Sequence, residues 1–204
     1  MTIRKGDEWG SIGPLPAGVV QVRSDGELGE LVTRHRVAGT DLPPVVLAGG
    51  DLMRAVGGGG SLDRLGGDVA HLPVDVVRVD ADGRTGWFVA HLVARRSWWH
   101  GEVVAVMNGQ HLRQWDVAAR AHPNDGRVDL VRVAATMSVR DRWQARRRAV
   151  TGAHVPHPAI SMSIHRQVTI ELSRPSNLWL DGRRWASAST LVLTVEPDAL
   201  VVCV

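Results

Sequence analysis

The sequence predicts an α+β protein, mainly an antiparallel β-sandwich, with a small truncated α/β lobe at its N-terminus. Three features of the 204-residue chain lead to this class. Strand-like and helix-like patterns alternate in the first quarter, a glycine-rich stretch follows at 57–67, and period-two alternation dominates from about residue 70. We therefore place a domain boundary in the glycine-rich stretch, with the lobe over 1–60 and the sandwich over 68–204.

The lobe is predicted from two apolar runs, VVQV at 19–22 and PPVVLAG at 43–49, which are typical of buried parallel strands. Between them, residues 24–37 have the apolar spacing of a helix. Ser24 or Asp25 can cap its first turn, because a short side-chain oxygen accepts the free N–H groups there. The first quarter is therefore expected to fold as strand, helix, strand and helix.

The segment VVLAGGDLMRAVGGGG, at 45–60, has the pattern of a strand, a glycine turn, a short helix and a glycine run. Glycines that follow a buried strand can cradle a phosphate, because backbone N–H groups then approach the anion closely. A tight turn is the commoner reason for glycine at such a place. The residues of this segment leave both interpretations open.

The sandwich is predicted from short strand-like segments that are separated by proline, glycine, asparagine and aspartate turns. These segments are 74–80, 87–94, 101–109, 127–136, 167–172, 177–182, 189–196 and the final run ALVVCV at 199–204. One helix is expected to interrupt them near 139–149. Trp98 and Trp99 are adjacent and cannot both point inward from one strand, so we expect one of them to face solvent or a partner.

Composition excludes several classes of protein. An apolar fraction of 44% with 22% charged residues is typical of a globular chain. No apolar run approaches the ~18 residues that cross a membrane, and MTIRKGDEWG at the start does not have the pattern of a signal peptide. Cys203 is the single cysteine, so an internal disulfide is excluded. We therefore expect a cytoplasmic protein.

The segment SVRDRWQARRRAV, at 138–150, is unusually basic. It could form a patch for phosphate, nucleic acid or an anionic membrane face. The interpretation that we favour is a solvated amphipathic helix whose apolar side carries Val139, Trp143 and Val150. No nucleic-acid motif accompanies the arginines, so we expect no nucleic-acid partner, and peripheral membrane contact remains the alternative.

Two motifs of the lobe resemble those of the bacterial diacylglycerol and lipid kinase family, which are relatives of NAD kinase. RSDGELGELV at 23–32 is similar to the family's GGDGTLNEVV, and LAGGDLMRAVG at 47–57 is similar to GTGNDLARALG. Later segments follow in the family's order, namely PVDVVRV, MNG, HPNDGRVDLVRV, GAH, LDG and VEPDALVVCV. The resemblance covers the chain from about residue 19 and implies a nucleotide-binding-like lobe joined to a lipid-kinase-like sandwich.

The resemblance also implies roles for individual residues, with ATP as co-substrate and Mg²⁺ as metal. Asp181 would be the base that accepts a proton from the substrate hydroxyl. Asp125, with the backbone carbonyls of His122 and Arg127, would bind a structural Mg²⁺. The implied cofactor-binding residues are Asp25, Gly26, Gly49, Gly50, Asp51, Asn108 and Gly109. Without the resemblance, Asp125 and Asp181 are ordinary turn aspartates that precede glycine.

Several positions depart from the family's pattern. Arg23 and Ser24 replace the two glycines whose amides would approach the ATP phosphates, and Glu27 adds a negative charge where a threonine stands in the family. Full-length members of the family begin with a further strand–helix unit, and here only residues 1–18 stand in its place. Other replacements are Gly50 for Asn, Arg183 for Glu, and Arg113, Gln114 and Trp115 for three glycines.

Two further constellations have weaker support. His154, His157 and His165 do not match a zinc spacing. Ser161 and Ser163 lie close to His165 in sequence, but the motif of a nucleophile elbow is missing. We therefore assign neither a zinc site nor a hydrolase site.

Three functions remain. The first is a catalytically degenerate lipid-kinase-like protein that binds a ligand or partner through the cleft that is the active site in the family. The second is an active ATP-dependent kinase that phosphorylates a hydroxyl of a lipid or small molecule. The third is an interaction module in which a second copy completes the exposed edge of the two-strand sheet, and this makes a homodimer the expected state.

Overall fold

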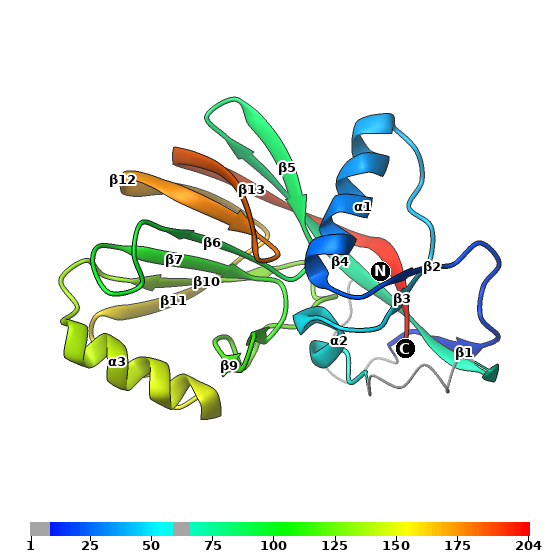
Figure 1. Ribbon diagram of the computed structural model, residues 1–204, viewed down its shortest axis with the longest axis horizontal. Coiled ribbons are helices and arrows are strands. Elements are labelled where there is room, and N and C mark those ends of the chain that lie inside the picture. The colour runs from blue at the N-terminus through cyan, green and yellow to red at the C-terminus, as the bar shows by residue number, and fades with distance from the viewer. Residues whose placement is uncertain (1–8, 59–65) are drawn as a thin grey trace.

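The computed structural model describes residues 9–58 and 66–204, and one sheet of eleven strands runs through them. The strands along the main path of this sheet follow the order β1-β4-β13-β12-β6-β7-β10-β11 (Figure 1). Side chains of β4, β13, β6 and β7 meet in one core, around which the antiparallel strands pack as a sandwich. The predicted fold class, α+β with a dominant antiparallel sandwich, is confirmed.

The elements have the following bounds. The strands are β1 (Ser11–Gly13), β2 (Val20–Val22), β3 (Val45–Leu47), β4 (Val69–Ala81), β5 (Arg84–Phe88), β6 (His91–Arg95), β7 (Val103–Met107), β8 (His111–Leu112), β9 (Trp115–Asp116), β10 (Val128–Val133), β11 (Ile160–His165), β12 (Gln167–Leu180) and β13 (Arg183–Cys203). The helices are α1 (Asp25–Ala38), α2 (Asp51–Ala55) and α3 (Val139–Arg148), and a 3-10 turn at Ala149–Thr151 follows α3. None of these helices is long and apolar enough to cross a membrane.

The two short strands of the lobe are parallel, as predicted, and they belong to the large sheet. β3 lies between β2 and the end of β13, where Val202 pairs with Val45. The C-terminal strand therefore covers the edge of β3 for which we expected a neighbour. Helix α1 begins at the Ser24 cap and buries Leu28 and Val32 against this part of the sheet.

In three places the strands are divided or joined differently from the prediction. The segment 87–94 is divided between β5 and β6, because the amides of Val89 and Ala90 donate to the Asp181 carboxylate and not to a neighbouring strand. Residues 167–180 form one strand with a bulge between Glu171 and Ser176. β13 is likewise one strand, with a bulge between Glu196 and Leu200. The prolines in these two strands mark bulges, and the prediction of separate strands there was wrong.

Helix α3 lies where the sequence predicts a helix, near 139–149. The apolar side of the predicted helix carries Val139, Trp143 and Val150, which are 46%, 49% and 54% exposed. The helix is held by Arg142, which is buried and donates to the carbonyls of Met137, Ala134 and other loop residues. A guanidinium has five N–H donors, so one side chain satisfies several carbonyls that the loops leave free. Helix α3 is solvated, as predicted, and the side that faces solvent includes its apolar side chains.

Candidate functional site

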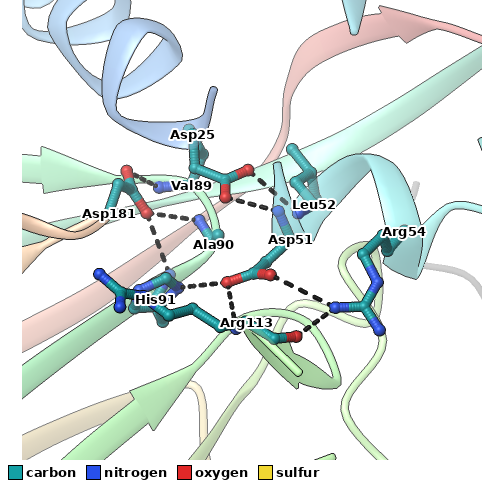
Figure 2. Close-up of polar contacts among 9 residues, drawn as sticks. All are labelled: Asp25, Asp51, Leu52, Arg54, Val89, Ala90, His91, Arg113 and Asp181. Atoms are coloured by element: carbon teal, nitrogen blue, oxygen red, sulfur yellow. Dashed lines mark hydrogen bonds and ion pairs between the residues drawn. The ribbon is translucent and has the colours of Figure 1, made fainter. Parts of the chain in front are cut away.

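The turns after β2 and β3 meet at the same end of the parallel strands. The Asp25 carboxylate accepts hydrogen bonds from the backbone N–H groups of Asp51 at 2.6 Å and Leu52 at 3.0 Å (Figure 2). Asp25 thus caps α2, whose own N-cap, Gly50, offers no side chain. These hydrogen bonds hold the segment 23–32 against the segment 47–57, the two segments that resemble the kinase family's motifs.

The glycines of the second motif are required by this contact. A β-carbon on Gly49 would overlap the carbonyl oxygen of Arg23, and one on Gly50 would overlap the Asp25 carboxylate. Gly50 also has a φ of 105°, which other residues rarely adopt. The glycine turn is therefore explained by close packing on the first motif. Its use as a phosphate cradle is not needed to account for it.

Glu27 occupies a backbone donor of the first motif. Its carboxylate accepts the N–H of Arg23 at 2.7 Å, while the Ser24 hydroxyl accepts the N–H of Glu27 at 3.2 Å. The pair is a variant of the capping box, whose sequence signature is Ser-x-x-Glu. That signature was present at 24–27 and could have predicted the contact.

Asp51 is surrounded by cationic and polar groups. Its carboxylate accepts the backbone N–H of Arg113 at 2.7 Å and lies 3.8 Å from the Arg54 guanidinium. Nδ1 of His91 is 3.9 Å away, a distance too long for a good hydrogen bond, and this buried nitrogen has no other partner among the described residues. Burial lowers the pKa of His91 to about 4, against the pull of Asp51, so the ring is neutral near pH 7.

Asp181 lies deepest in the site. Its carboxylate accepts three backbone N–H groups, from Val89 and Ala90 at 2.9 Å each and from His91 at 3.1 Å (Figure 2). Burial raises the pKa of Asp181 to about 8, and the neighbouring Asp25 carboxylate acts in the same direction, while the three amides act against both. The predicted base therefore stands beside Asp25, under α1, with little access to solvent.

Asn108 and Gly109 were predicted to contact a cofactor, and the structure places them at the back of the site. The Asn108 amide group donates to the carbonyls of Asp75 and Val89, and the side chain is buried. Gly109 faces Ala55 of α2. Gly26, on α1, faces the Arg183 side chain. Asn108 therefore ties β4 to the turn between β5 and β6, and the two glycines allow close approach of Arg183 and Ala55.

The predicted magnesium turn forms a separate cluster around Asp75. The Asp125 carboxylate accepts the N–H of Arg127 at 2.9 Å, and the His122 carbonyl accepts the N–H of Asp125 at 3.3 Å. Burial raises the pKa of Asp75 to about 7, and the charge of Asp125 adds to this increase. Within 9–58 and 66–204, no three His, Cys, Asp or Glu side chains are grouped as metal ligands. The magnesium site stays a prediction.

An apolar pocket of about 130 Å³ lies between α3 and the face of β7 and β10 that points away from the sandwich core. Aromatic and aliphatic side chains form most of its wall, and Arg142, Arg146 and His154 are its polar members. The apolar wall includes Trp98, Trp99, Leu112, Trp115, Val131, Met137 and Ile160. Trp98 is the more exposed of the tryptophan pair, so the prediction that one of the two faces outward is confirmed.

Two polar groups at this pocket are poised for a ligand. The Arg146 guanidinium stacks 4.7 Å from the Trp115 ring and 5.6 Å from the Trp99 ring. His154 is buried, and its ring lies beside the Val117 backbone and the Asp116 carboxylate without a geometrically good hydrogen bond to either. Burial lowers its pKa, so the ring is neutral near pH 7 and can donate or accept one hydrogen bond.

The hairpin of β8 and β9 joins the pocket to the carboxylate site. Leu112 and Trp115 line the pocket, and Arg113, between them, donates its N–H to Asp51. The Arg113 carbonyl also accepts a hydrogen bond from the Arg54 guanidinium. Sequence reasoning noted Arg113 only as a departure from the family, because its role depends on the fold of the hairpin.

The residues of the two weaker constellations make local contacts. His157 accepts the N–H of Ala159 on its Nδ1, and His165 contacts the Ser163 hydroxyl at 2.7 Å on an exposed strand. The three histidines are not grouped as metal ligands in the part of the chain that is described.

These features define a β-sandwich of the NAD kinase type that carries a small α/β lobe. Residues 67–204 match the family described as the YegS C-terminal NAD kinase beta sandwich-like domain, and the chain belongs to this family. The predicted relationship to the diacylglycerol and lipid kinase family is thereby confirmed. No curated protein matches the sequence.

Three solved structures from Bacillus anthracis str. Sterne have the same fold. One is described as a diacylglycerol kinase, with 14% identity, a TM-score of 0.65, and coverage of 90% of this chain and 75% of that chain. Two described as putative diacylglycerol kinases have 13% identity, TM-scores of 0.66 and 0.67, and coverage of 90% of this chain and 76% of each of theirs. At these identities the likeness shows the fold alone.

Proposed function

We propose that this lipid-kinase-like protein is catalytically degenerate and acts by binding a ligand with an apolar group in the pocket beneath α3. The observation that carries the proposal is the contact of Glu27 with the Arg23 amide. In the family's motif this turn would offer its amides to a phosphate. Here an internal carboxylate takes a donor that an incoming anion would need, and it repels that anion.

The other groups needed for phosphoryl transfer are also engaged. Transfer requires a phosphate cradle, Mg²⁺ and a base near the acceptor hydroxyl. The Asp51 carboxylate is bonded to Arg113 and lies beside Arg54, and Asp181 is buried with three amide donors. These residues, as arranged, do not fit a MgATP site, although family membership makes ATP and Mg²⁺ the expected co-substrate and metal.

The pocket supports binding of a small apolar group. A cavity of about 130 Å³ has nearly the size of the roughly 150 Å³ cavity that holds benzene in an engineered protein. It can therefore accept an aromatic ring or a short stretch of acyl chain. Arg146 and His154 favour a ligand that has an anionic or hydrogen-bonding group next to this apolar part.

Calorimetry tests the nucleotide half of the proposal. We expect MgATP to bind more weakly than millimolar, and the triple variant Arg23→Gly, Ser24→Gly, Glu27→Thr to bind it more tightly. The matched control is Glu30→Thr, which removes a carboxylate from the same helix but leaves the Arg23 amide engaged. Submicromolar affinity of the native protein for MgATP would reject a degenerate site.

Titration with hexanoate and with dihexanoylglycerol, followed by NMR, tests the ligand half. Ala149→Leu should fill the pocket and weaken binding at least about tenfold, whereas Ala38→Leu, at an exposed position on α1, should not. If Ala149→Leu unfolds, Ala145→Leu on the same wall replaces it. Equal binding by the pocket variants and the control would contradict the assignment of the pocket.

An active kinase is the second candidate, and Asp181 is the observation that favours it. The family's base position is retained, and its raised pKa of about 8 suits proton transfer near neutral pH. This candidate requires α1 to move away from Asp181 when substrate binds. Transfer of labelled phosphate from MgATP to a short-chain diacylglycerol, abolished by Asp181→Asn, would establish it.

A further inference from the structure

The outward side of α3 and its 3-10 turn forms a surface that we call the α3 face. It consists of Val139, Trp143, Arg147 and Val150, with Arg140 and Arg148 beside them. Its apolar members are among the most exposed large apolar side chains of the described residues. An exposed tryptophan flanked by exposed valines on one helix face is uncommon in a soluble protein and indicates an interaction surface.

The orientation of this face is fixed by the packing of the opposite side. The buried guanidinium of Arg142 donates to carbonyls of two loops, and Ala149 is buried in the pocket wall. Rotation of the helix to bury Trp143 would remove Arg142 from these carbonyls and leave both sides of each hydrogen bond unpaired. The hydrogen bonds of the buried Arg142 therefore hold α3 in the orientation that leaves Trp143 exposed.

The charges of the face have one sign. Arg140, Arg147 and Arg148 are exposed, and the guanidinium of Arg147 lies 4.7 Å from the centre of the Trp143 ring. The acidic member of the helix, Asp141, is turned toward the N-terminus, where its carboxylate accepts the Ser138 hydroxyl at 2.7 Å. The face thus combines an amphipathic ring, branched aliphatic side chains and several cations.

We infer that the α3 face docks on the surface of an anionic lipid bilayer. Tryptophan is favoured at the boundary between head groups and acyl chains, and arginines beside it pair with lipid phosphates. Each arginine near an anionic bilayer strengthens binding roughly fivefold. Trp99 lines both the hollow beside Trp143 and the pocket beneath α3, so docking brings the bilayer next to that pocket.

Flotation with lipid vesicles tests this inference without ATP or a pocket ligand. We expect the native protein to float with vesicles of equal parts phosphatidylcholine and phosphatidylglycerol at low salt, to be released by high salt, and not to float with phosphatidylcholine alone. Arg140→Glu with Arg147→Glu should weaken binding at least about tenfold. Trp143→Ser should weaken it severalfold, and quenching of tryptophan fluorescence by brominated acyl chains should decrease in Trp143→Phe.

Matched controls lie outside the α3 face, and two of them, Arg34 and Val37, are on α1, which is far from α3 in the molecule (Figure 1). Arg34→Glu with Arg166→Glu reverses two exposed arginines outside the face, and Val37→Ser removes an exposed apolar side chain from α1. All the changed residues are exposed, so unfolding temperatures should stay close to the native value.

Three results would overturn the inference. One is a native protein that does not distinguish anionic from neutral vesicles. Another is equal loss of binding in the control and face variants. The third is a dimer in light scattering that Trp143→Ser dissociates, since the face would then join two copies of the chain. Because the pocket variant Ala149→Leu should still float, failure of the ligand proposal is separable from failure of membrane docking.

Discussion

The carboxylate of Asp181 lies directly against Gly29 of α1. A β-carbon on Gly29 would be 2.8 Å from Oδ2 of Asp181, closer than such atoms approach in proteins. The helix and the sandwich thus meet at the Asp181 carboxylate. The three hydrogen bonds that this carboxylate accepts from backbone N–H groups prevent it from moving aside. The missing side chain at 29 is what allows α1 to cover the predicted base.

Gly29→Ala should therefore destabilise the protein, although alanine is normally favoured over glycine in a helix. We expect a loss of about 1–3 kcal/mol in the free energy of unfolding, because the site is overpacked. Gly26→Ala is the control in the same helix, since its β-carbon would meet the exposed, flexible side chain of Arg183. Urea unfolding measures both, and a stabilised Gly29→Ala would contradict the contact.

Asp181→Ala should cost at least about 3 kcal/mol of unfolding free energy. The change leaves three backbone N–H groups without an acceptor, and each costs about 1–3 kcal/mol when buried. Asp181→Asn keeps one acceptor oxygen and should cost less than the alanine variant. Asp41→Ala, at an exposed loop position, should change stability by less than about 0.5 kcal/mol.

His91 should make the fold less stable in acid. Its pKa is about 4 in the folded protein against 6.5 for the free group, so the unfolded chain binds more protons between these values. The stability gained from the neutral, buried ring is present above pH 6.5 and is lost as the pH falls toward 4, by up to about 3 kcal/mol.

Chemical unfolding from roughly pH 4.5 to 7.5, which covers most of the interval between the two pKa values, measures this effect. His91→Gln should flatten the pH dependence relative to the native protein. The exposed His100→Gln is the control and should leave it unchanged. Parallel curves for the native protein and His91→Gln would show that His91 is not the group responsible.

The outer edge of β2 remains the basis for the predicted homodimer. Among the described residues β2 pairs with β3 alone, and Val20 on it is exposed. Light scattering at micromolar concentration should give the mass of two chains, and Val20→Lys should give one. The similarly exposed Val201→Lys is the control. A native mass of one chain, unchanged on concentration, would exclude the dimer.

Much of the fold was predictable because its signals are local. Alternation of apolar and polar residues marked most strands, and Ser24 marked the start of α1. The break between β5 and β6 was not predictable from the local pattern. The backbone N–H groups of Val89 and Ala90 donate to the carboxylate of Asp181, about 90 residues away in sequence, and not to a neighbouring strand. Helix α3 was placed correctly, but its orientation depends on loop carbonyls that only the folded chain brings together.

The candidate site, too, was predictable in some of its residues and not in others. The resemblance brought Asp25, Asp51 and Asp181 into one proposal, and the structure places them in one region: Asp25 accepts the N–H of Asp51, and its charge raises the pKa of Asp181. Whether they bind a cofactor or act on a substrate remains a prediction. Sequence reasoning treated Glu27 only as a repulsive charge, because it did not consider that a carboxylate at the third helical position can bind its own turn.

β13 has a consequence for how the protein unfolds. Its first half contributes Leu191 and Leu193 to the sandwich core, and its end contributes Leu200 and Val202 to the core beneath α1. A single strand thus belongs to two cores, and neither can lose it without exposing the other. We expect calorimetric and van't Hoff enthalpies to agree in one transition, and a fragment of residues 1–60 to stay unfolded by itself.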